Sequence, residues 1–470
     1  MKTIMPQRMA IASSLALLAA CAAVPPRAPP DPAATAQAFA ARRLDELSPE
    51  LPALSAGWDR AQWLKAALML NPQLAEERAR TTAVAAAERT AAQIRNPTLN
   101  LSGEYITAAA GGAAWLYGLS LDFLLQRPGD RSRARRSTAL QTQAAQSDLA
   151  ESIWQVRAAL RQGLLDMAYS QDQATLLRKL CSDRESLLAS ARANANAGEI
   201  SGTEALRAGL ELAAARQRLS QAQANGVDAQ SRLAIAVGIP ASALEGMPPP
   251  WPQWADIGAL SSTLPGPWRD EALVARPDLV RALREYDLAE NALQGELARR
   301  WPEFHVTPGY AWDRGGVQEN QFDQNLHDNE LGLSLELPLF NRNEGPIGEA
   351  VARRELAGKH LEAVQANLFG QMDRAERAWP RERQAWQDAV DATLLAQRQS
   401  QAQQRALGVG ASDRPTALLA EVAAIEAQLL TLQAAYEAQR AYAALEDAYR
   451  RPLQGPECEL SPSWRTEKAS

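Results

Sequence analysis

The stretch from Gly129 to Gly198 contains no proline and only one internal glycine, Gly163. Apolar residues recur along it at gaps of three, four and seven: Leu149, Ile153, Val156, Leu160, Leu164 and Met167, then Leu176, Leu180 and Leu187. This spacing is typical of a helix packed against other helices. About 65 to 70 residues, at about 1.5 Å each, make a rod about 100 Å long, whereas a small domain is only about 30 Å across. The rod therefore needs partners along its whole length.

The chain is built from two copies of one unit. Matching landmarks follow one another in the same order at offsets of 205 to 214 residues: 71–74 with 276–279, 95–97 with 300–302, 118–122 with 332–336, and 198–206 with 410–418. We place the first repeat at 58–240 and the second at 271–452. A linker rich in proline and tryptophan, 241–270, joins them, and a tail, 453–470, follows.

Each repeat is predicted to contain a medium helix, a β-hairpin, a long helix, a glycine-containing turn and a second medium helix. The first medium helix is expected from Trp58 to Arg95. Apolar and polar side chains alternate with period two in the hairpins, about 98–125 and 303–340. The turns lie at about 196–202 and 408–415. Two medium helices of about 36 residues each are together as long as the long helix. We therefore expect them to stack end to end along it.

The hairpins fit a membrane barrel better than a soluble sheet. Strands of about nine residues with one apolar face can span a bilayer, and Trp115, Tyr117, Tyr310 and Trp312 lie where an interfacial girdle would place them. Two hairpins supply four strands, whereas closed membrane barrels begin at about eight. An open sheet edge cannot sit in lipid, because its backbone groups would be unpaired. A membrane sheet would therefore need several copies of the chain. A soluble sheet with one face on a core is the alternative.

Residues 1–20 are predicted to be a signal peptide, with a positively charged start and a short apolar core, Met9–Ala20. The core ends in Leu18-Ala19-Ala20-Cys21, which matches the lipobox of bacterial lipoproteins, so Cys21 would be the palmitate-bearing mature N-terminus. An ordinary signal peptide with a chance cysteine is the alternative. Ala22, in place of an aspartate, fits sorting to the outer membrane. We expect 21–57 to be a lipidated N-terminal tether.

Composition excludes other classes of protein. A net charge of −6 argues against a nucleic-acid binder. Beyond the leader, no apolar run of about 18 residues predicts a spanning helix. No G-x-S-x-G, H-E-x-x-H or P-loop pattern occurs, so we expect neither an enzyme nor a cofactor.

Metal-ligating and thiol chemistry is also sparse in the sequence. His327 lies with Asp323, Asp328 and Glu330 in the longer second hairpin loop, but a solvated loop is the default reading and no metal site is assigned. Cys181 is expected to be a small, at least half-buried residue, and a disulfide between Cys181 and Cys458 stays open. A proline inside the second long helix, Pro380, is expected to bend it.

These landmarks together resemble the TolC family of outer-membrane efflux channels over nearly the whole mature chain. The resemblance rests on the lipobox, the duplicated unit, and the turn Gly198-Glu199-Ile200-Ser201 followed by Glu204-Ala205-Leu206. The stretch 335–343, Leu-Glu-Leu-Pro-Leu-Phe-Asn-Arg-Asn, resembles the hairpin exit of the heavy-metal-efflux branch typified by CzcC.

The resemblance implies a mainly α fold with membrane β. Three protomers would form a twelve-stranded β-barrel, continued by a long α-helical periplasmic tunnel. Such a homotrimer would work with a periplasmic adaptor (membrane fusion) protein and an inner-membrane pump of the RND type, and its barrel would be embedded in outer-membrane lipid.

In that arrangement the glycine turns become the periplasmic tips, where Glu199, Glu204 and Asp413 could ring a threefold constriction. Carboxylates brought together there would repel one another and attract cations. Small residues would let the adaptor approach closely: Gly198, Ser201, Gly410 and Ser412. The alternative is that Glu204 only favours the start of a helix, and that Ser412 or Asp413 only caps one.

The predicted function is therefore the outer-membrane channel of a tripartite efflux system. Heavy-metal cations and drugs are the candidate substrates, and selectivity is expected to lie mainly in the pump. A lipid-anchored periplasmic coiled-coil scaffold without a pore is the alternative. The adaptor of such a pump is disfavoured, because adaptors carry one helical hairpin flanked by β-rich domains.

Overall fold

The computed structural model describes residues 27–44, 58–108, 112–245, 254–260, 267–314 and 327–459. The chain divides into two units, the first ending at Arg43 and the second beginning at Leu44. In the first unit, helix α2 (Pro32–Ala40) is capped by Asp31, whose carboxylate accepts a hydrogen bond from the Ala33 amide at 3.0 Å. The expected signal peptide and Cys21 lie outside the described residues.

The second unit contains the same order of elements twice. The first copy comprises α3 (Arg60–Leu70), α4 (Pro72–Ala91), β1 (Thr98–Ala108), β2 (Gly112–Leu125), α5 (Asp130–Asn196) and α6 (Gly202–Val237). The second comprises α7 (Pro267–Ala275), α8 (Pro277–Ala298), β3 (Glu303–Arg314), β4 (His327–Glu336), α9 (Glu344–Gly408) and α10 (Arg414–Tyr449). Short 3-10 helices follow α6, precede α7 and follow α10: η2 (Ala241–Leu244), η3 (Trp254–Ala259) and η4 (Pro456–Glu459). The order of elements confirms the duplication.

The first medium helix of each copy is broken, which corrects the single helix expected from Trp58 to Arg95. Helix α3 ends at Leu70, and α4 starts at Pro72 after the extended residue Asn71 (ψ 120°). The second copy breaks in the same way at Arg276, before Pro277. The ring of a proline disfavours helical geometry at the preceding residue, so both breaks follow from the sequence.

Both break residues also hold the end of the returning helix of their copy. The Asn71 side-chain amide donates a hydrogen bond to the Ala236 carbonyl at 2.8 Å, and the Arg276 guanidinium donates one to the Ala448 carbonyl at 2.6 Å. The donors differ by 205 in residue number and the acceptors by 212, which are offsets of the repeat. Helix-terminal carbonyls lack partners within their own helix, so each bond satisfies one of them.

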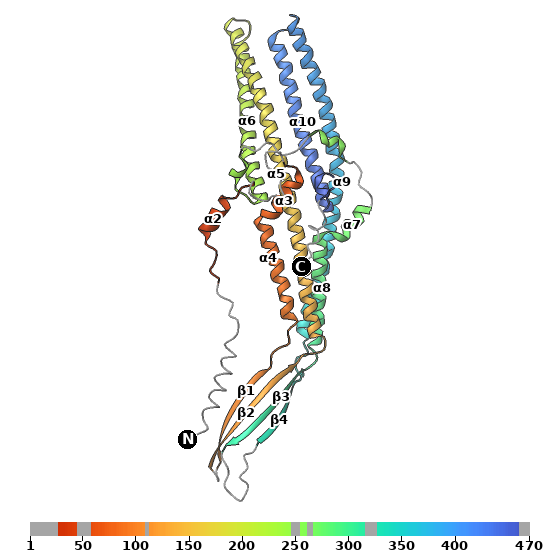
Figure 1. Ribbon diagram of the computed structural model, residues 1–470. Helices are drawn as coiled ribbons and strands as arrows, with labels where there is room; N and C mark the ends of the chain where they lie inside the picture. The colour runs from red at the N-terminus through yellow and green to blue at the C-terminus, as the bar shows by residue number, and fades with distance from the viewer. Residues whose placement is uncertain are drawn as a thin grey trace. The chain divides into compact units, whose positions relative to one another are not determined.

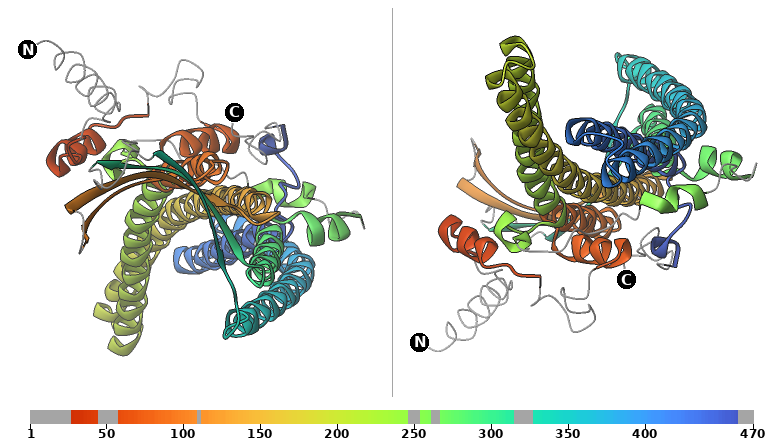
Figure 2. Two further views of the ribbon diagram at one scale, coloured as in Figure 1. Left: turned by 90° about the horizontal axis from the view of Figure 1, so that it is seen from below. Right: turned by 90° about the horizontal axis from the view of Figure 1, so that it is seen from above.

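The long helices run beside pairs of shorter ones. Helix α5 is contacted by α3, α4 and α6, and α9 is contacted by α8 and α10. Figure 1 shows α4 and α6 following each other along α5, with the strands at one end and the turns between paired helices at the other. The expected end-to-end stacking is confirmed. Helix α5 also contacts α8 and α10, so it joins the two copies, as both views in Figure 2 show.

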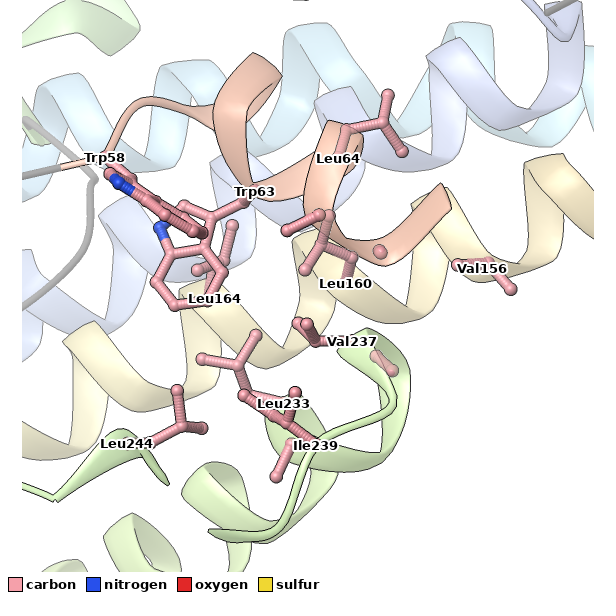
Figure 3. Close-up of a cluster of buried hydrophobic side chains, with 14 of the residues drawn as sticks. Trp58, Trp63, Leu64, Val156, Leu160, Leu164, Leu233, Val237, Ile239 and Leu244 are labelled. Carbon is pink, nitrogen blue, oxygen red and sulfur yellow. The ribbon is translucent and has the colours of Figure 1, made fainter. Parts of the chain in front are cut away.

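The largest apolar cluster lies where α3, α5, α6 and η2 meet (Figure 3). Trp63, Leu160, Leu164 and Leu233 are almost completely buried there. Gly163 allows a close approach of the two helices at this crossing, because a Cβ added to it would lie 3.1 Å from the Leu233 Cα atom, closer than an ordinary van der Waals contact. A second cluster contains Ile257 of η3, packed with residues of α9 and α10, so the linker contributes to the core of the second copy.

The four strands form one antiparallel sheet in the order β1-β2-β3-β4. The register pairs Leu99 with Leu121, Phe123 with Val306, and Val306 with Leu333. One face is therefore apolar and the other polar, because successive side chains in a strand point to opposite faces. Large apolar side chains on the first face are exposed: Leu99, Leu101, Tyr105, Trp115, Leu119, Leu121, Phe123, Phe304, Tyr310, Leu331, Leu333 and Leu335.

Helix α9 continues through Pro380, so the bend there stays a prediction. Cys181 is buried, as expected, and Cys181 and Cys458 are both free thiols.

By length and composition α10 could cross a bilayer, contrary to the expectation from apolar runs. Its buried residues nevertheless lie among those of α5 and α9, which is the environment of a core helix.

Candidate gate at the helix tips

The two turns that end the long helices have the same backbone geometry. Gly198 and Gly410 adopt positive φ angles of 75° and 73°. The amide after each glycine reaches back to the last turn of the helix: Glu199 N to Asn194 O at 2.9 Å, and Ala411 N to Ala406 O at 2.8 Å. This is the Schellman arrangement, in which glycine carries no steric penalty. Both positions are sterically open, because a Cβ added to either glycine would have no heavy atom within 4 Å.

The turn between α5 and α6 presents its polar groups to solvent. Glu199 and Glu204 are exposed, and Glu204 lies in the first turn of α6, where a carboxylate favours the helix dipole. Ser201 precedes α6, but its hydroxyl lies 2.7 Å from the Thr203 hydroxyl and makes no capping bond to the backbone.

In the turn between α9 and α10, Asp413 caps α10. Its carboxylate accepts a hydrogen bond from the Thr416 amide at 2.7 Å. Hydrogen bonds from Thr416 hold the pKa of Asp413 below its usual range, so the group is ionised at neutral pH. Ser412 does not cap the helix; its hydroxyl donates to Gln403 at 3.0 Å.

Among the described residues of one chain, no hydrogen bond or ion pair joins the two tips. The capping role that the sequence offered as an alternative for Asp413 is present, and Glu204 has the position of a helix-start residue. Neither role removes the negative charge, so both residues can still contribute to a ring formed by several chains.

Polar links along α10 join it to the α5–α6 pair, and no pattern in the sequence predicts them. Lys179 of α5 pairs with Glu421 at 3.1 Å, and Arg218 of α6 pairs with Glu426 at 2.8 Å. Nearer the middle of the helices, the Tyr436 hydroxyl donates to Asp166 at 2.6 Å. Burial, and then the bond to Asp166, raise the pKa of Tyr436 to about 12. These contacts bridge the α9–α10 pair and the α5–α6 pair.

A buried ion cluster ties α5 to α10 and to the C-terminal segment. Arg157 and Arg161 of α5 both donate to the Glu446 carboxylate, and Arg157 also donates to Glu457 at 2.8 Å. Burial lowers the pKa of Arg161 to about 9, with nearby guanidinium groups adding to the shift. Burial alone would raise the pKa of Glu457, but the guanidinium groups hold it below its ordinary value. The available sequence signal was a pair of arginines four residues apart, beside the apolar stripe of α5.

The weak metal candidate around His327 is only partly covered by the residues that the structure describes. Within the described ranges, no group of three or more histidine, cysteine, aspartate or glutamate side chains is close enough to hold a metal ion. Asp328 and Glu330 lie on strand β4 and not in a loop, which corrects their expected position. Asp323 lies outside the described residues.

The sequence profile of the outer membrane efflux protein family matches residues 63–239 and 268–449, on either side of the linker. The chain belongs to this family. The resemblance to outer-membrane efflux channels of the TolC type is thereby confirmed, and so are the assignments to efflux and to the outer membrane. No curated protein sequence matches the chain.

Solved structures of membrane channels share the fold. OprN superposes with a TM-score of 0.66 at 17% identity, over 92% of this chain and 99% of that one. CusC gives 0.67 at 17%, over 90% and 98%. The open state of MtrE from Neisseria gonorrhoeae gives 0.66 at 17%, over 92% and 98%. At these sequence identities the similarity shows a shared fold and does not identify the substrate.

Proposed function

We propose that this outer membrane efflux protein is the channel of a tripartite system, and that three copies form one pore. The observation that carries the proposal is the sheet. It has an exposed apolar face, a polar opposite face, and edge strands β1 and β4 that have no further neighbouring strand among the described residues. Such a sheet can enter lipid only if its edges are paired. Three copies would supply twelve strands in a closed, even-numbered antiparallel barrel.

The partners and cargo follow from this proposal. The tips would receive a periplasmic adaptor, and an inner-membrane pump of the RND type would deliver substrate to it. Heavy-metal cations and drugs both remain substrate classes. The polar face carries Glu104, Asp122, Glu330 and Glu336, and carboxylates lining a barrel would favour cationic cargo.

The test is the oligomeric state of the purified full chain in detergent, followed by conductance in a planar bilayer. We expect a trimer and discrete channel openings. A stable monomer without conductance would instead support the coiled-coil scaffold. Such a scaffold does not require an exposed apolar sheet face.

Replacing Cys21 by serine is expected to prevent acylation and to leave unprocessed or mislocalised precursor, because the thiol is the proposed lipid acceptor. Palmitate labelling and the abundance of the protein in outer-membrane fractions measure this. Cys458→Ser is the matched control, since that exposed thiol is far along the chain from the leader. Normal processing and abundance of the Cys21 variant would remove the lipid anchor from the proposal.

The double variant Glu199→Gln and Asp413→Asn is expected to lose cation preference. It removes two exposed carboxylates per chain, so a ring formed by several chains would lose the negative charges that attract cations. Asparagine caps helices about as well as aspartate, so α10 should keep its start. Single-channel recording of ion selectivity is the measurement.

Glu355→Gln with Asp391→Asn makes the same change of charge at exposed positions of α9 and serves as the control. If the tip variant keeps the selectivity of the unmodified channel, the tip carboxylates are helix-end residues only.

A further inference from the structure

Each of the four places where a strand joins a helix carries an arginine within two residues of a large apolar side chain. The pairs are Ile94 with Arg95 before β1, Leu125 with Arg127 after β2, Trp301 with Arg300 before β3, and Phe340 with Arg342 after β4. The four junctions lie together at the strand end of the long helices (Figure 1). The motif therefore recurs at one level of the fold, although its members are spread over about 250 residues of sequence.

The apolar members are too exposed for a protein in water alone. Ile94 is 70% exposed, Trp301 73% and Phe340 fully exposed. Aromatic and basic side chains together are the composition of a membrane–water interface, where the ring enters the headgroup layer and the cation stays among the phosphates.

A second aromatic row gives the distance between the two interfaces. Tyr105, Trp115, Tyr117, Trp312 and Tyr310 form a chain of ring contacts, with centroids 4.8 to 6.0 Å apart. Trp301 and Trp312 are 11 positions apart, or about 36 Å along a strand. At a tilt of about 45°, this is about 25 Å along the membrane normal, the height of the apolar band of an outer-membrane barrel.

Some junction arginines already hold the protein together. Arg127 donates to the Trp301 carbonyl at 2.7 Å and pairs with Glu303 at 3.0 Å, while Arg131 donates to the Ala92 carbonyl at 2.9 Å. By contrast, the exposed side chains of Arg95, Arg300 and Arg342 have no hydrogen bond or ion pair within the ranges that the structure describes. We call these three residues the arginine belt.

The surroundings of the belt are basic, although the whole chain is acidic. Residues 126–136 contain five arginines and one carboxylate, Asp130, which pairs with Arg133. A hollow of about 760 Å³ lies between α4, α5 and α8 at this level, and Arg95 and Arg299 are among its lining residues. A surface of this kind attracts anions.

We propose that the arginine belt binds the anionic headgroups of phospholipids in the periplasmic leaflet of the outer membrane. Phosphate binding alone would not require the exposed Ile94, Trp301 and Phe340, which a lipid would cover with its glycerol and acyl region. The proposal rests on the membrane barrel proposed above. A barrel could form without any preference for anionic lipids, so this preference is an additional property.

The test compares the full-length trimer with the variant Arg95→Gln, Arg300→Gln and Arg342→Gln. Both are titrated in neutral detergent with phosphatidylglycerol or with phosphatidylcholine, and binding is followed by native mass spectrometry and thermal melting. We expect phosphatidylglycerol to bind the unmodified protein at least tenfold more tightly than phosphatidylcholine. Each arginine near an anionic lipid contributes on the order of fivefold, so the variant should lose most of the preference. Added salt should weaken it as well.

The control is Arg192→Gln, Arg374→Gln and Arg398→Gln, which removes three exposed arginines of α5 and α9 outside the strand–helix junctions. It should keep the lipid preference, and circular dichroism checks that both variants fold. Equal affinity for the two lipids, or an equal loss in the control, would overturn the belt. A belt variant that alters ion selectivity but not lipid affinity would place these arginines in the pore and would also overturn it.

Conductance in a phosphatidylcholine bilayer separates this proposal from the channel proposal. Channels that open without any phosphatidylglycerol preference would overturn the belt alone. The absence of channels in every lipid would overturn both.

Discussion

Replacing Glu446 by glutamine is expected to lower the free energy of unfolding by about 3–5 kcal/mol, the cost of breaking a buried ion pair from one side. Glu446 is fully buried and Arg157 is 1% exposed. The carboxylate accepts from Arg157 at 2.8 Å, from Arg161, and from the Leu453 amide at 2.8 Å. Glutamine keeps the shape but removes the charge, so two buried guanidinium groups lose their shared partner. Urea unfolding of the detergent-solubilised protein, followed by the helical signal, measures the change.

Glu426→Gln is the matched control on the same helix. Its partner Arg218 lies at 2.8 Å, but both side chains are more than a third exposed, and exposed pairs contribute only about 0–1 kcal/mol. An equally small effect of both substitutions would show that the buried cluster does not hold α5, α10 and the C-terminal segment together.

Replacing Leu333 or Leu335 by arginine is expected to prevent stable insertion of the barrel. A positive charge on the lipid face costs about 2–4 kcal/mol near the middle of the bilayer, and three chains would multiply that cost. Leu333 is opposite Val306 and Leu335 is opposite Phe304, both on the apolar face. The measurements are the amount of trimer in outer-membrane fractions and its unfolding midpoint in lipid vesicles.

Ser334→Arg is the control for this prediction. Ser334 lies between the two leucines but is opposite His305 on the polar face, so a charge there should be tolerated by the fold. Equal losses at positions 333, 334 and 335 would mean that the apolar face does not meet lipid.

Much of the fold was predictable because local patterns encode it. The proline-free stretch 129–198 became α5, from Asp130 to Asn196, and the two glycine turns were located within a few residues. Alternating side chains predicted the strands, and repeated landmarks predicted the duplication. The broken first helix was missed, although Asn71-Pro72 and Arg276-Pro277 carried the necessary signal, since a residue before proline avoids helical geometry.

The candidate gate was only partly predictable. Its turns follow from Gly198 and Gly410, but a single sequence could not decide whether Asp413 caps α10, faces a pore or does both. The capping bond to Thr416 is now visible, while the ring of carboxylates stays a prediction, because it needs neighbouring chains.

The sequence by itself determined the element types, their order and the two faces of the sheet, because helix and strand periods and turn residues act over a few positions. Tertiary structure alone decided which charges meet. Arg157 binds Glu457, which is 300 residues away in the sequence, and Lys179 pairs with Glu421, which is more than 200 residues away. No periodicity links such residues. They become neighbours only when apolar packing has brought α10 and the C-terminal segment beside α5. Burial then makes the pairing of Arg157 with Glu457 obligatory, whereas the side chain of Lys179 stays more than half exposed.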